Sequence, residues 1–104
     1  MEYDMNKDLL PVGTIVKVRF SKVEYMIFGF YIKDPNAEKP FDYCALPYPW
    51  GLLNLNDMVA FDRDVIKKVV HMGYVSEEEK QYKQELEEER KKGKTPINIE
   101  MMDL

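Results

Sequence analysis

Apolar and polar residues alternate along short stretches of the first three quarters of the chain, and a period of two is typical of half-buried β-strands. In residues 14–20 the even positions are Thr, Val, Val and Phe, while Lys17 and Arg19 stand at odd positions. Residues 23–32 are nearly all apolar or aromatic, and Gly29 among them indicates a bulge or a sharp bend. The pattern therefore predicts two strands here, of which the second is the more central.

Three further short strands are predicted over residues 41–46, 58–61 and 66–74. Between the last two, Asp62 is expected to cap a single helical turn at residues 62–64. The residues of the last strand that roughly share a face are Ile66, Val70, Met72 and Tyr74. Five short strands separated by turns predict a small antiparallel sheet that curls into a partial β-barrel.

A helix is predicted to follow the strands, from about residue 76 to about residue 92. Ser76 and Glu79 have the spacing of a capping box, which satisfies exposed backbone N–H groups at a helix start. Only Tyr82 and Leu86 among its apolar residues share a face. We therefore expect the helix to lie on the sheet edge through its first half and to project into solvent through its second half.

These elements predict an α+β fold, a curled antiparallel sheet of about five strands followed by one C-terminal α-helix, in a single domain of residues 1–93. Residues 94–104 form a C-terminal tail in which Ile97, Ile99 and Met101 alternate with polar residues. Two interpretations stay open for the tail. It adds a strand to its own sheet or to a partner, or it is a frayed terminus.

The net charge and the distribution of apolar residues indicate which partners and which location to expect. The formal net charge is −4, which argues against a nucleic-acid partner because phosphate binding needs clustered Lys and Arg. No apolar run approaches the roughly 18 residues that a membrane span requires. The first residues have neither the basic start nor the apolar stretch of a signal peptide, so a cytoplasmic location is expected.

The residue types that carry catalysis are sparse. His71 is the only histidine, and its alternation with apolar neighbours places it on the outer face of a strand. Cys44 is the only cysteine and stands in an apolar strand, as an inert packing cysteine does. The glutamates of residues 77–89 are interspersed with lysines, as on a solvated helix face. We therefore expect no enzyme activity, no metal and no cofactor, and a protein that works by binding another macromolecule.

Apolar and aromatic residues outside the strands are the candidate binding residues. Trp50 lies in a Tyr-Pro-Trp-Gly turn, and two interpretations of it stay open. It folds back over the open end of the sheet as a lid, or it is an anchor for a partner, as interface aromatics are. The candidate partner-binding residues are Tyr48, Trp50, Ile97, Ile99 and Met101.

An ordered set of short motifs runs through most of the chain. The motifs are LPVGT at residues 10–14, MIFG at 26–29, DY at 42–43, YPWG at 48–51, Phe61, Asp64, Ile66, and GY at 73–74. In this order they resemble the small proteins known as domain of unknown function 4176. The resemblance covers about residues 9–82, and where that family often has an acidic residue in the Tyr-Pro-x-Gly turn this chain has Trp50.

The resemblance implies a biological setting. Proteins similar to these are encoded in Gram-positive bacteria beside type VII secretion genes and toxins with an LXG domain. It implies a cytoplasmic chaperone or targeting factor that binds the N-terminal targeting region of such a toxin before export. The alternative is an immunity protein that neutralises the toxic domain, and the part of the toxin that binds discriminates between the two.

Overall fold

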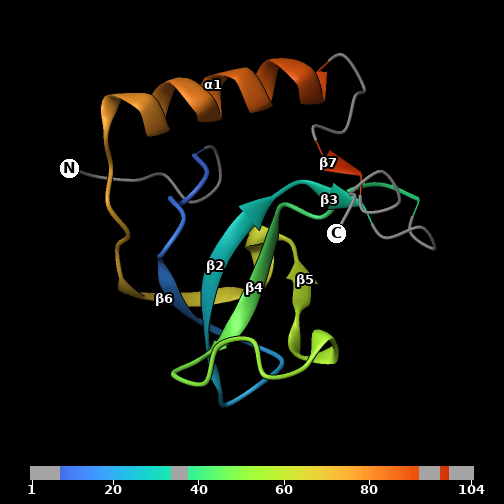
Figure 1. Cartoon of the computed structure of the whole chain (residues 1–104), viewed down its shortest axis with the longest axis vertical. Coiled ribbons are helices and arrows are strands. Elements are labelled where there is room, and N and C mark those ends of the chain that lie inside the picture. Colours follow the sequence, from blue (N-terminus) through green and yellow to red (C-terminus); the bar gives the residue numbers. More distant parts are fainter. Residues whose placement is uncertain (1–7, 34–37, 92–96, 99–104) are drawn as a thin grey trace.

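A computed structural model describes residues 8–33, 38–91 and 97–98 (Figure 1). Its main sheet has five strands in the order β5-β4-β2-β1-β6, and every neighbouring pair is antiparallel. The strands are β1 (Ile15–Val18), β2 (Glu24–Phe30), β4 (Tyr43–Tyr48), β5 (Val59–Phe61) and β6 (Ile66–His71). The sheet is not closed, and the predicted α+β class, with one helix after the strands, is confirmed.

The remaining elements connect and cover this sheet. Figure 1 shows α1 lying across one end of the sheet, with the connection between β4 and β5 at the opposite end. Two further short strands, β3 and β7, pair in parallel and form a separate sheet, with Ile32 opposite Ile97. These elements are α1 (Glu77–Lys91), β3 (Ile32–Lys33), β7 (Ile97–Asn98) and the 3-10 turns η1 (Leu55–Asp57) and η2 (Arg63–Val65).

The bulge predicted at Gly29 is confirmed. The register of β2 against β4 shifts between Ile27 and Gly29. A Cβ atom on Gly29 would lie 2.7 Å from the sulfur of Cys44, so only glycine lets the two strands approach this closely. The extra residue increases the local bend and twist, which curls the sheet around its inner face.

The inner face of the sheet carries the hydrophobic core. Val16, Val18 and Ile27 are fully buried there, which confirms the alternation predicted for the first strand up to Val18. Phe20 was expected to continue that face, and this prediction is wrong. The strand ends at Val18 and the chain turns, so the Phe20 ring is half exposed and lies 5.7 Å from the ring of Tyr25.

The face predicted for the last strand is also wrong. Of its four residues only Ile66 is buried, whereas Val70, Met72 and Tyr74 are exposed. The strand ends at His71, so Met72 and Tyr74 lie beyond it, and Val70 falls at one of two register shifts between β1 and β6 and has no partner on β1. His71 is exposed, as predicted for an outer position.

The chain leaves β6 through a tight crossing. Gly73 donates its backbone N–H to the buried hydroxyl oxygen of Thr14 at 3.0 Å. A Cβ atom on Gly73 would lie 3.0 Å from the backbone nitrogen of Thr14 and 3.1 Å from the carbonyl carbon of Gly13. Gly13 itself has a φ of +93°, which an L side chain rarely adopts. The two glycines therefore let the segment before β1 and the segment after β6 touch.

The helix begins as predicted, with the Ser76 hydroxyl accepting a hydrogen bond from the Glu79 N–H at 3.1 Å. The expectation that its second half projects into solvent is wrong. Leu86 is 2% exposed and belongs to the core, while the Arg90 guanidinium lies 5.6 Å from the centre of the Tyr31 ring. Leu86 belongs to the apolar pair that the sequence showed, whereas the contacts of Glu87 and Arg90 with Tyr31 involve charged side chains that no apolar pattern predicts.

Candidate partner-binding surface

The connection between β4 and β5 exposes a run of large apolar side chains. Leu53 is 75% exposed, Leu55 68% and Trp50 59%. We call residues 48–58 the apolar loop, and its exposed apolar members are Tyr48, Trp50, Leu52, Leu53, Leu55 and Met58. Six such residues in one short segment are unusual, because exposed apolar side chains on soluble proteins are normally scattered.

The backbone of the apolar loop is held by its own hydrogen bonds. The Gly51 N–H donates to the Pro47 carbonyl at 2.7 Å, and Gly51 has a φ of +70°, a conformation that suits glycine. The η1 turn is closed by a reciprocal capping box. In that box the Asn54 side chain accepts from the Asn56 N–H at 2.9 Å, and the Asp57 carboxylate accepts from the Asn54 N–H at 3.0 Å. The polar groups of the loop are thus paired with its own backbone, and the apolar groups remain in solvent.

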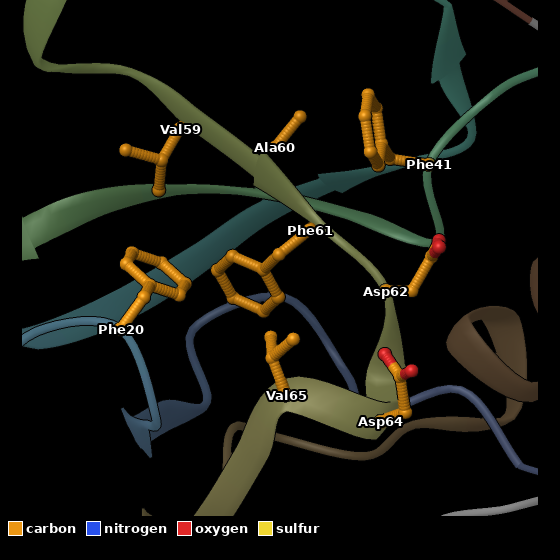
Figure 2. A pocket seen from close by; sticks show the side chains of 8 residues that line it. All are labelled: Phe20, Phe41, Val59, Ala60, Phe61, Asp62, Asp64 and Val65. Carbon is orange, nitrogen blue, oxygen red and sulfur yellow. The ribbon is translucent and has the colours of Figure 1, made fainter.

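The apolar loop leads into β5, beside which lies a pocket of about 470 Å³ (Figure 2). Figure 2 shows the rings of Phe20 and Phe61 beside Val65, with Asp62 and Asp64 further along the same segment. The two ring centres are 6.0 Å apart. The lining residues are Phe20, Phe41, Val59, Ala60, Phe61, Asp62, Asp64 and Val65. The pocket is therefore apolar with two carboxylates at its border.

No cationic residue occurs in the sequence between Lys39 and Arg63. Within that segment the Asp42 carboxylate accepts from the Arg63 Nε at 3.0 Å, and Asp62 accepts from the Asp42 N–H at 3.1 Å. The second bond corrects the prediction that the Asp62 side chain caps the η2 turn, for which it makes no hydrogen bond. The apolar loop and β5 thus contribute no positive charge, and the pocket beside β5 is bordered by the carboxylates of Asp62 and Asp64.

The structure places the predicted binding residues in different regions. Tyr48 and Trp50 both lie in the apolar loop, and at 59% exposure Trp50 is not a lid, so that interpretation is wrong. Ile97 lies in β7, which Figure 1 shows near α1 and away from the apolar loop. Ile99 and Met101 fall outside the described residues.

Sequence reasoning missed the leucines and the methionine of the apolar loop. Leu52, Leu53 and Leu55 follow no strand or helix period, and a segment without period was treated as a connection only. The signal that identifies them is composition: four large apolar residues in residues 52–58, interrupted only by Asn and Asp. Apolar residues that cannot belong to a strand or helix face are candidates for an interface.

The described titratable cluster at the other end of the sheet ties α1 to the strands. The Tyr31 hydroxyl donates to the Glu87 carboxylate and accepts from the Arg63 guanidinium at 3.3 Å. Burial, together with the Glu87 carboxylate, raises the pKa of Tyr31 far above its ordinary value. Tyr31 therefore stays protonated as a hydrogen-bond donor, and the arrangement fixes the helix without supplying a general base.

Within residues 8–33, 38–91 and 97–98, no three His, Cys, Asp or Glu side chains are grouped so that they could hold a metal ion. Over the same part of the chain, no helix has the length and apolar character needed to cross a membrane.

Comparison with known proteins gives one match. The family model described as "Domain of unknown function (DUF4176)" matches residues 9–82, which include the whole five-stranded sheet and the start of α1. No curated protein and no solved structure matches the chain.

Proposed function

We propose that this protein, which belongs to the DUF4176 family, is a non-catalytic accessory factor that binds a protein partner through its apolar loop. The observation that carries the proposal is the exposure of six large apolar side chains on a loop whose backbone is held by its own hydrogen bonds. Such residues add little to the stability of the free protein, so their exposure favours a role in recognition.

Physical chemistry favours this loop as an anchor. Burial of an apolar side chain contributes about 25 cal/mol per Å² of surface removed from water. Aromatic residues supply much of the binding energy at protein interfaces while losing few rotamers. A loop already ordered by the Asn54 and Asp57 bonds loses less conformational entropy on binding than a floppy one. Trp50 and Leu53, which are well exposed, are therefore the best candidates for anchors.

The partner that we propose is a secreted LXG-type toxin, held or targeted in the cytoplasm before export by a type VII secretion system. This setting is what the resemblance to the family implies, and the exposed side chains of the apolar loop support it through their capacity to bind an apolar segment. Its occupant is a segment of the toxin's N-terminal targeting region with an exposed apolar stripe, which the apolar loop would shield from water until export.

The proposal is tested by co-purification with an LXG toxin encoded beside the gene for this protein. The N-terminal half and the C-terminal half of the toxin are expressed separately. We expect the N-terminal half to be retained by the wild-type protein and lost with the variant Trp50→Ala/Leu53→Ser. The matched control is Tyr74→Ala, which removes another exposed aromatic ring from outside the apolar loop. Retention of the toxic C-terminal half alone, or self-toxicity of a deletion strain that still exports the toxin, would replace the proposal with the immunity role.

A further inference from the structure

The edge of the sheet formed by β6 carries several exposed basic side chains. Its cationic side chains are all exposed and lie on the neighbouring strands β1 and β6 or directly after β1. We call the following set the basic edge: Lys17, Arg19, Lys67 and Lys68. The whole chain has a net charge of −4, so the positive charge on this edge differs in sign from the protein as a whole.

The cations of the basic edge are not paired within the described structure. Lys17 lies directly opposite Lys68 in the register of β1 and β6. Every described ion pair joins other residues, namely Asp42–Arg63, Glu77–Lys80, Glu79–Lys83 and Glu87–Arg90. Like charges directly opposite each other on adjacent strands are destabilising. The fold therefore carries a repulsion here that an anionic ligand would relieve.

Protection of the sheet edge explains only part of this charge. Lysines on an edge strand discourage pairing with other chains, and Lys67 and Lys68 on β6 fit that role. Lys17 lies on β1, which is paired with both β2 and β6 and has no free edge to protect. Arg19 follows β1, and its N–H donates to the Val65 carbonyl at 2.9 Å. Because of Lys17 and Arg19, the positive surface extends from the end strand β6 onto β1.

We propose that the basic edge is a second interaction surface, which takes an extended acidic segment of a protein partner as an added strand along β6. In the described residues β6 is an end strand of the sheet, so one side of its backbone is open to a new strand. The ammonium groups of Lys67 and Lys68 would attract the carboxylates of that segment, and the exposed His71 ring can donate an N–H to it. The exposed side chains of Val70 and Met72 would take its apolar residues.

A nucleic acid fits this surface less well than a protein segment. The exposed apolar side chains of Val70 and Met72 would gain nothing from a phosphate backbone, whereas they can pack against the apolar side chains of a peptide. The basic edge and the apolar loop lie towards opposite edges of the sheet, because β6 and β5 are its two end strands. The protein can therefore bind one segment at the basic edge and another at the apolar loop. A substitution in one surface should leave binding at the other unchanged.

The direct test is fluorescence anisotropy with a labelled peptide in which Glu and Val alternate over eight residues. We expect the wild-type protein to bind it, and Lys67→Glu/Lys68→Glu to weaken the affinity at least tenfold. The control Lys80→Glu/Lys91→Glu makes the same change in net charge on the exposed face of α1 and should alter the affinity less than twofold. Trp50→Ala should leave peptide binding unchanged, which separates this surface from the one in the proposed function.

Two further probes identify the mode of binding. A peptide with the same side chains and N-methylated backbone nitrogens keeps its charge but cannot pair as a strand, so we expect it to bind at least fivefold more weakly. A short DNA duplex should bind more weakly than the Glu-Val peptide. The proposal is overturned if the peptide does not bind, if the two double variants weaken it equally, if N-methylation has no effect, or if the duplex binds more tightly.

Discussion

In folded proteins apolar side chains are usually buried and charged ones exposed, and the two ends of this sheet show the reverse. At the α1 end, Tyr31, Arg63 and Glu87 are polar or charged, yet they are largely withdrawn from water and bonded to one another. At the other end, Trp50 and Leu53 are apolar and stand in solvent. The comparison indicates that the polar end serves the fold, whereas the role that we propose for the apolar end is recognition. Changes at the first should lower stability, and changes at the second should lower binding.

The largest expected effect is at Leu86, the described residue of α1 that is buried in the core. Leu86→Ala should lower the free energy of unfolding by about 2–5 kcal/mol, because it leaves a cavity between the helix and the sheet. Chemical denaturation followed by circular dichroism measures the change. Tyr82→Ala, at the half-exposed neighbour one turn earlier, is the control and should cost clearly less. Equal effects would mean that the helix is not seated through Leu86.

The next effect is at Trp50, and it should appear in binding only. Trp50→Ala should weaken toxin binding by about 2 kcal/mol, as the truncation of an interface anchor does. The free energy of unfolding should change by less than about 0.5 kcal/mol, because the side chain contacts mostly water. A titration and a thermal melt on the same preparation decide the matter. A large drop in Tm with unchanged affinity would move Trp50 from the recognition end to the fold.

A smaller effect is expected from the Tyr31 hydroxyl. Tyr31→Phe keeps the ring beneath Arg90 and removes the hydrogen bonds to Glu87 and Arg63, which should cost about 1–2 kcal/mol of stability. Glu87→Ala, which removes the acceptor, should cost a similar amount, and the double variant should cost less than the sum because both changes break the same bond. Strict additivity in this cycle would show that the Tyr31–Glu87 bond does not hold the helix.

The smallest effect concerns Cys44, which lies on the same strand as Tyr48 but in the core. Burial raises the pKa of its thiol to about 12, so the thiol stays protonated and unreactive in the folded protein. We expect iodoacetamide at about pH 8.5 to label the unfolded chain within minutes and the native chain hardly at all. Since the unfolded thiol ionises first, this group stabilises the fold fully below about pH 8.5 and less as the pH rises towards 12. Rapid native labelling would show that the strand opens.

Local patterns predicted local features well. The period of two predicted that Val16 and Val18 face the core, Gly29 predicted the bulge, and Ser76 predicted the start of the helix. Each of these features depends on residues that are neighbours in the sequence. The contacts of Glu87 and Arg90 with Tyr31 could not be predicted, because they join residues more than 50 positions apart and follow no hydrophobic period.

The candidate site was predicted in part. Tyr48 and Trp50 were found from their turn, whereas the leucines of the apolar loop were missed because they lie in a segment with neither period. The face predicted for residues 66–74 failed for another physical reason. Two register shifts between β1 and β6 break the alternation, and a single sequence does not show where a strand partner will force such a shift.

The crossing of Gly73 over Gly13 also constrains the order of folding. It closes a loop of about 60 residues, and the entropy lost on closing a loop rises with its length, to roughly 3–4 kcal/mol for one of this size. Hairpins such as β1–β2 close far shorter loops and can form early. The pairing of β6 with β1, sealed by the two glycines, is therefore the natural last step. Because α1 is attached beyond Gly73, a nascent chain would expose Leu9, Leu10 and the underside of the sheet until that step is complete.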